Sequence, residues 1–101
     1  MRRPVFNSYY RRLKRLFPTR RKLRVYFVPA DKLHKEHGFE VHGDYHDSPT
    51  GGVIRIADDV PEDQAVDTLT HEASHFLSRR KRHGKQFWET HGRIYRALFG
   101  D

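Results

Sequence analysis

One stretch decides the fold: residues 61–78, which read PEDQAVDTLTHEASHFLS. Proline in the first turn, followed by the acidic Glu62 and Asp63 near the positive end of the helix dipole, is typical of a helix start. Apolar residues then recur at steps of three and four and form one stripe. They are Ala65, Val66, Leu69, Ala73, Phe76 and Leu77. His71 and His75 point roughly 180° to 220° away from the centre of that stripe, so the spacing predicts a helix with an apolar face and a histidine face.

The histidine face carries the pattern H-E-x-x-H, made by His71, Glu72 and His75. Histidines four residues apart lie on one helix face, so two neutral imidazoles can reach one Zn²⁺ at about 2.0 to 2.1 Å each. Glu72 is rotated from His71 by about 100°, which suits a general base better than a third ligand. Chance placement gives roughly 0.03 copies of this pattern in such a chain. The pattern indicates a zinc site, and two exposed polar histidines on a solvated helix face are the alternative.

Catalytic zinc has three protein ligands beside an open position, so a third ligand is needed. His83 is the first candidate, because Gly84 allows a turn there and Phe87 and Trp88 can anchor the next helix against the core. His91 lies on the apolar stripe of that helix and is the competitor, with core packing as its alternative role. The remaining histidines fall in a loop-and-strand segment, where solvated side chains are expected. They are His34, His37, His42 and His46.

The rest of the chain predicts a small sheet between helices. Residues 6–17 have amphipathic helical spacing, with Asn7 or Ser8 as the cap. β-Branched and aromatic runs predict strands at 24–28, 40–45 and 53–57, and the last two form a hairpin. The inward stripe of the last helix comprises Phe87, Trp88, His91, Ile94, Tyr95, Leu98 and Phe99. We expect one α+β domain over residues 1–101. Its parts are a basic N-terminal helix (1–22), a small sheet (23–58), an active-site helix (61–79) and a C-terminal helix (84–99).

The composition limits the chain to one small domain, with 101 residues, 36% of them hydrophobic, and no cysteine. Disulfides and thiolate zinc knuckles are excluded, so histidine and carboxylate must hold any metal. No apolar run approaches the ~18 residues of a membrane span, and the basic N-terminal region has no apolar signal core. We therefore expect a monomer in the cytoplasm, without membrane contact.

The net charge of +7 is unevenly distributed along the chain. Ten of the 20 Lys and Arg residues lie between residues 2 and 24, and no acidic residue precedes Asp31. A second basic cluster follows the H-E-x-x-H helix. Such clusters attract nucleic acid or an acidic partner, although a basic helix face is more often simply solvated. The candidate nucleic-acid contacts are Arg11, Arg12, Arg15, Arg79, Arg80, Arg82 and Lys85.

The H-E-x-x-H pattern followed by His83-Gly84-x-x-Phe87-Trp88 resembles the SprT-like and Spartan-type zinc metalloproteases. In length the chain is similar to phage-encoded metallopeptidases of that group, which implies the host cytoplasm. The resemblance covers about residues 40 to 98 and includes Gly43-Asp44-Tyr45, Gly51 to Ile56 and Thr68-Leu69. It implies a minimal zincin-like fold, with His83 as third ligand and proteins on DNA as substrates. The linker from His75 to His83 is shorter than in many members, and the cysteine-rich zinc ribbon of some members is absent.

The expected reaction is hydrolysis of a peptide bond in a protein or peptide substrate. Zn²⁺ lowers the pKa of its water towards ~7, and Glu72 takes the proton and passes it to the leaving amine. The expected substrate strand adds to the edge of residues 53–57. The candidates for an oxyanion donor or for supporting the ligands are Tyr45, His46, His91 and Arg93. Two other functions stay open: a non-catalytic nucleic-acid-binding module and a structural zinc site in which Glu72 is incidental.

Overall fold

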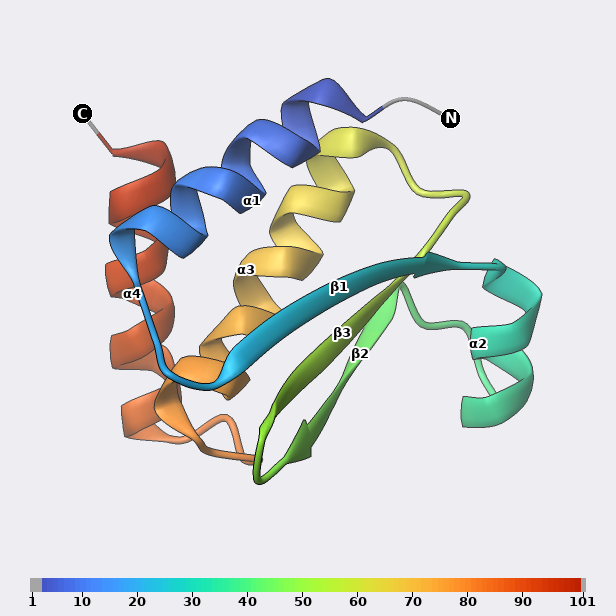
Figure 1. The fold of residues 1–101 in the computed structure, drawn as a ribbon. Helices are drawn as coiled ribbons and strands as arrows, with labels where there is room; N and C mark the ends of the chain where they lie inside the picture. The colour runs from blue at the N-terminus through green and yellow to red at the C-terminus, as the bar shows by residue number, and fades with distance from the viewer. Residues whose placement is uncertain (1–2, 101) are drawn as a thin grey trace.

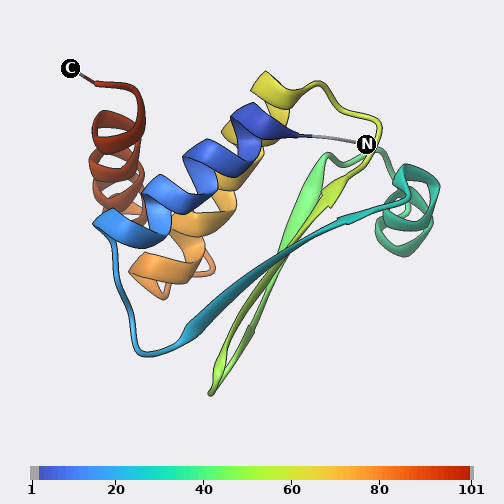
Figure 2. The same ribbon diagram turned by 45° about the horizontal axis from the view of Figure 1, so that its top comes forward.

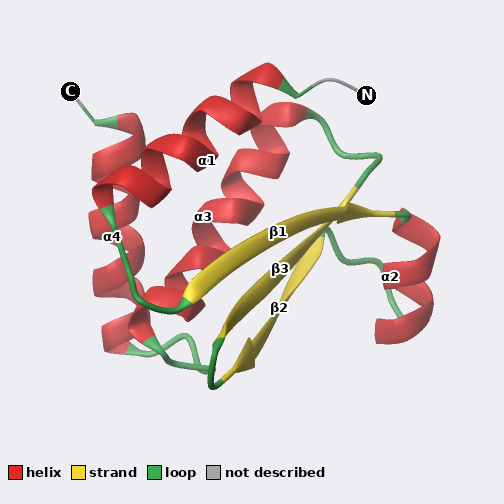
Figure 3. Ribbon diagram, viewed as in Figure 1, coloured by secondary structure: helices red, strands yellow, loops and turns green. Residues whose placement is uncertain are grey.

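The computed structural model describes residues 3–100 and has the expected α+β architecture, with helices beside a three-stranded sheet (Figures 1 and 3). In chain order the elements are α1 (Pro4–Leu16), β1 (Lys22–Val28), α2 (Ala30–His37), β2 (Gly43–Ser48), β3 (Gly51–Ala57), α3 (Glu62–Ser78) and α4 (Lys85–Phe99). Helices α1, α3 and α4 lie together on one side of the sheet, and α2 lies at its far end (Figure 2). No helix in the described part of the chain has the length and apolar character needed to cross a bilayer.

The sheet has the strand order β1-β3-β2. The predicted hairpin is confirmed, because β2 pairs antiparallel with β3 and places Tyr45 opposite Ile54. Strand β1 pairs parallel with β3 on its other side. The expectation that residues 53–57 offer a free edge is therefore wrong. Strand β3 is central, and the two free edges belong to β1 and β2.

The core forms where α3 packs between the sheet and the other two long helices. The predicted stripe of α3 is confirmed, since five of its six residues are buried and Leu77 is partly buried. The buried cluster consists of Phe6, Leu13, Ile54, Ile56, Ala65, Val66, Leu69, Ala73, Ile94 and Leu98. On α4 the inward stripe is narrower than expected, because Trp88 and Tyr95 are 52% and 50% exposed. Trp88 therefore does not anchor α4 in the core.

The start of α1 differs from the expectation, for a reason that involves α3. The helix begins at Pro4, which needs no backbone N–H in the first turn, so neither Asn7 nor Ser8 is the cap. Instead, the Glu62 carboxylate accepts the backbone N–H of Phe6 at 3.0 Å. A residue from the first turn of α3 thus satisfies an N–H group that α1 cannot bond internally. This contact also fixes the start of α1 against the start of α3.

Helix α2 was not predicted, and the predicted start of β2 is wrong. Helix α2 is short, buries only Leu33 and ends at Gly38, which has the left-handed φ of 77° that glycine adopts readily. Strand β2 begins at Gly43 instead of Glu40. A side chain at Gly43 would meet Thr68 of α3 and the Arg55 carbonyl oxygen, each 2.6 Å from the Cβ position. Glycine therefore allows β2 to lie close against α3.

A cluster of charged and polar side chains lies on the sheet face that points away from α3. Asp44, only 8% exposed, accepts a hydrogen bond from Arg55 Nε at 2.9 Å and pairs with His37 of α2 at 2.9 Å. Burial alone raises the pKa of Asp44, but these two partners outweigh burial and lower it to about 2. Asp44 therefore connects β2, β3 and α2 as a carboxylate.

The depressed pKa of Asp44 predicts a defined loss of stability in acid. The folded-state pKa lies below the ordinary value of 3.8, so the contribution is present above that value and is lost as the pH falls towards about 2. Asp44→Asn should lower the free energy of unfolding by about 2 kcal/mol at pH 7 and flatten its pH dependence between pH 4 and 2. Urea unfolding across this pH range measures both effects. Asp59→Asn, in an exposed loop, is the control, and equal stability of the Asp44 variant and the wild type would contradict the assignment.

Candidate metal centre

Three histidines converge where the C-terminal half of α3 meets the start of α4. His71 and His75 lie one turn apart on α3, and His83 lies in the segment that joins α3 to α4. One ligand nitrogen from each lies within 4.8 Å of the other two. The segment turns back because Arg79 adopts a left-handed backbone conformation, with a φ of 58°, directly after α3. The short linker is therefore long enough to bring His83 to the histidine face.

A backbone hydrogen bond orients the ring of His75 towards His83. His75 Nδ1 lies 2.7 Å from the backbone oxygen of Arg80. Because a carbonyl only accepts, Nδ1 carries the hydrogen and Nε2 presents a lone pair. That lone pair faces His83 Nε2 at 3.1 Å. Two nitrogens bound to one tetrahedral Zn²⁺ lie about 3.3 Å apart, so the separation of His75 and His83 suits this ion, and His71 places its nitrogen within 4.8 Å of both.

Phe87 of α4 forms the floor of the histidine cluster. Its ring is fully buried, and its centroid lies 5.1, 4.5 and 4.7 Å from those of His71, His75 and His83. Burial, followed by the nearby charges of His83, His75 and His91, lowers the pKa of His71 to about 4. His71 is therefore neutral at pH 7, as a metal ligand must be.

Glu72 points its carboxylate into the same region from within the protein. It is 8% exposed, and its Oε1 lies 4.0 Å from His75 Nε2. Burial, followed by the nearby charge of Asp44, raises the pKa of Glu72 to about 7, although His37 opposes this effect. A carboxyl group with a pKa near neutrality can both take up and release a proton at pH 7.

Tyr45 reaches the cluster from β2. Its ring is stacked against that of His75 with a centroid distance of 6.4 Å, and its hydroxyl donates to Asp47 at 2.5 Å. Burial, followed by the bond to Asp47, raises the pKa of Tyr45 to about 12, so it remains a hydrogen-bond donor. The ring occupies the space above Gly52, where any Cβ would come within 2.6 Å of it.

The other three candidates for an oxyanion donor or a supporting role lie outside the three-histidine group. His46 contacts Asp44 at 3.2 Å on the outer face of the sheet, because neighbouring residues on a strand point to opposite faces. His91 packs beside Trp88, with ring centroids 5.3 Å apart. Arg93 is exposed and lies over the Phe17 ring, 5.8 Å from its centroid.

The predicted basic residues are exposed and fall into two groups. Arg11, Arg12 and Arg15 lie on α1. The second group lines a hollow with a volume of about 580 Å³ that also contacts Phe87, the floor of the histidine cluster. This group comprises Arg79, Arg80, Arg82 and Lys85. The hollow places positive charge beside the histidines.

Sequence reasoning missed the supporting contacts of the site. Nothing in the sequence pointed to the Arg80 carbonyl or to the contact between Tyr45 and Asp47. The contact of Phe87 with the histidine rings could have been expected from the sequence, because Phe87 follows His83 by four residues at the start of a helix.

Comparisons with protein-family models, with curated proteins and with solved structures found no match to this chain.

The ligand assignment predicts opposite outcomes for two histidine variants. His83→Ala should weaken zinc binding by more than about a hundredfold, because even an outer partner of a ligand costs about 10- to 100-fold. His91→Ala should retain the affinity of the wild type. Competition with a chromogenic chelator measures both, and EDTA should lower the Tm of the wild type. Loss of zinc in His91→Ala together with retention in His83→Ala would assign the third ligand to His91.

Proposed function

We propose that this protein is a zinc-dependent peptidase of the SprT-like type. The observation that carries the proposal is the position of the buried Glu72 carboxyl group beside three converging histidine nitrogens. A structural zinc site needs only the ligands. A buried carboxyl group that accepts no hydrogen bond from a cation destabilises the fold, so its presence supports a role in proton transfer.

The residues divide into ligands, a proton carrier and a positioning group. His71, His75 and His83 would hold the ion through their ring nitrogens. When bound, Zn²⁺ supplies a Lewis acid that polarises a carbonyl group and makes water more acidic. Glu72 accepts the proton of the attacking water and delivers it to the amine of the leaving peptide. Tyr45 packs against His75 and holds that ring in place.

Strand β2 is the best candidate to bind an extended substrate. It is an edge strand, and Tyr45 places it beside His75. An extended peptide can pair with the free edge of such a strand through backbone hydrogen bonds. This assignment replaces the edge of residues 53–57, which is covered on both sides.

Replacement of Glu72 separates an enzyme from a structural zinc protein. Glu72→Gln keeps the shape of the side chain and removes its ability to take up a proton. The kcat/KM for a fluorogenic peptide should fall by about a hundredfold or more, while zinc content and Tm stay close to those of the wild type. Glu89→Gln, an exposed residue of α4, is the matched control. Retained hydrolysis in Glu72→Gln protein would refute the proposed mechanism.

The basic hollow beside the histidines also favours a class of substrate, namely proteins bound to DNA. The hollow is lined by Arg79, Arg80, Lys81, Arg82 and Lys85 and contacts Phe87. Phosphate contacts made through such side chains do not depend on base sequence. DNA bound in the hollow would hold an attached protein next to the site.

Fluorescence anisotropy of labelled DNA, titrated with the protein, tests whether the basic hollow binds DNA. The affinity should fall with about the 0.9 power of salt concentration for each phosphate contacted on double-stranded DNA. Arg79→Gln with Arg82→Gln should reduce that slope, whereas Lys32→Gln with Lys35→Gln on α2 should not. Millimolar affinity at low salt would remove DNA from the proposal and leave the peptidase function standing.

A further inference from the structure

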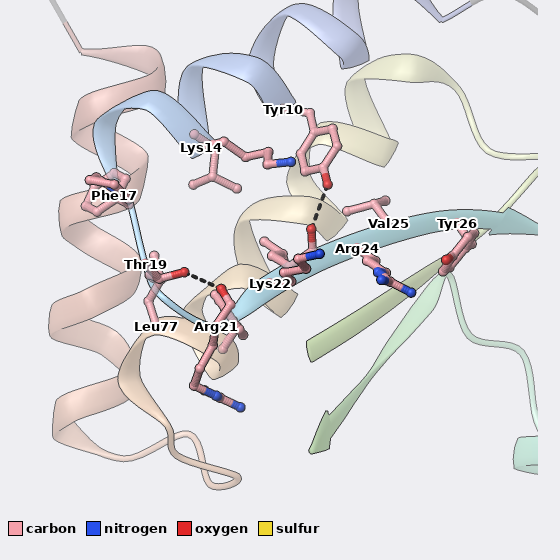
Figure 4. Close-up of a pocket in the computed structure, with 14 residues that line it drawn as sticks. Tyr10, Lys14, Phe17, Thr19, Arg21, Lys22, Arg24, Val25, Tyr26 and Leu77 are labelled. Carbon is pink, nitrogen blue, oxygen red and sulfur yellow. Dashed lines mark hydrogen bonds between the residues drawn. The ribbon is translucent and has the colours of Figure 1, made fainter. Parts of the chain in front are cut away.

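A groove separate from the metal centre runs between α1 and β1. Its volume is about 650 Å³, within the range of ligand-binding cavities. Figure 4 shows Tyr10 and Lys14 reaching from α1 towards β1, with Arg24 and Tyr26 farther along the strand. The groove lies at the β1 edge of the sheet, and β2 forms the opposite edge beside the histidines.

One side of the β1 backbone faces this groove. The Lys22 N–H and the Val28 carbonyl bond on the β3 side, to Thr50 and Asp58. The Leu23 carbonyl points the other way, where it accepts the Tyr10 hydroxyl at 2.9 Å. Alternate residues of a strand direct their backbone groups to the same side, so Val25 also presents its N–H and carbonyl to the groove. The strand therefore offers a backbone edge to a partner.

The side chains around the groove combine an apolar interior with a basic rim. Leu13, Leu23, Val25, Phe76 and Leu77 supply apolar surface. The rim carries Lys14, Lys22 and Arg24, and no acidic residue lines the groove. Within residues 3–100, none of these three cations forms an ion pair with a carboxylate. Arg21 also lines the groove but is already paired with Asp47.

We propose that this groove binds an acidic, extended segment of a partner polypeptide, which adds to β1 as a further strand. Backbone groups of the segment pair with Val25, its apolar side chains enter the groove, and its carboxylates meet the rim. A strand that alternates acidic and apolar residues presents these two kinds of side chain on opposite faces. A nucleic acid would match the positive rim but would leave the backbone edge without strand pairing. The proposal is independent of the metal centre and of the proposed peptidase activity.

The direct test uses the full chain and a labelled peptide of about eight residues that alternates glutamate and valine, close to the length of β1. Fluorescence anisotropy should show saturable binding, and a peptide with lysine in place of glutamate should not bind. Methylation of alternate backbone nitrogens, on the edge that faces β1, should weaken binding at least about tenfold, because it removes the strand hydrogen bonds. Hydrogen exchange of the Val25 amide should slow when the acidic peptide is bound.

A matched pair of variants places the peptide on the protein. Lys22→Glu with Arg24→Glu should weaken binding at least about tenfold, whereas Lys32→Glu with Lys35→Glu, on α2, makes the same change in net charge and should have little effect. Equal weakening by both pairs would show attraction by overall charge and would overturn the proposal. Unchanged Val25 exchange, equal binding of the methylated peptide, or tighter binding of single-stranded DNA at the same rim would also overturn it. The exchange measurement needs no variant, so it stands even if a substitution prevents folding.

Discussion

The enclosure of α3 is the constraint on which the rest of the structure depends. One face of this helix packs on the sheet and α1, while the face that carries His71 and His75 meets the start of α4. Phe87 of α4 makes the contact with this second face, because it packs directly against the rings of the three histidines. In a chain without cysteine, the same apolar contact therefore stabilises the fold and sets the positions of the three histidine rings.

Two equally buried carboxyl groups have very different pKa values, because their hydrogen-bond partners differ. Asp44 and Glu72 are each 8% exposed, yet the pKa is about 2 for the first and about 7 for the second. Arg55 and His37 hydrogen-bond Asp44 and stabilise its charge. No such cation is bonded to Glu72 among the described residues, so burial dominates its pKa. One carboxylate thus joins elements of the fold, while the other retains a proton near neutral pH.

The sequence was most informative where contacts are local and periodic. The spacing along 61–78 predicted α3 and its buried stripe, and the turn at Gly84 suggested the approach of His83 to the other two histidines. Contacts between distant segments left no comparable signal, as with the cap that Glu62 provides to α1 from 56 positions away. Helix α2 has one buried residue, Leu33, and hence no apolar period to detect. The parallel pairing of β1 with β3 likewise depends on tertiary packing that no local pattern records.

The histidine cluster and the sheet also differ in the sequence separation of the residues that form them. His71, Glu72, His75, His83 and Phe87 belong to one helical hairpin, whereas β1 pairs residues 22–28 with residues 51–57 of β3. Contacts between near neighbours close small loops and form early in folding, while pairing between distant segments is slow. The histidine cluster can thus assemble on the folding pathway before the sheet forms on the other face of α3. If the cluster binds zinc as proposed, zinc in the surrounding solution would change the rate of folding as well as the stability of the folded protein.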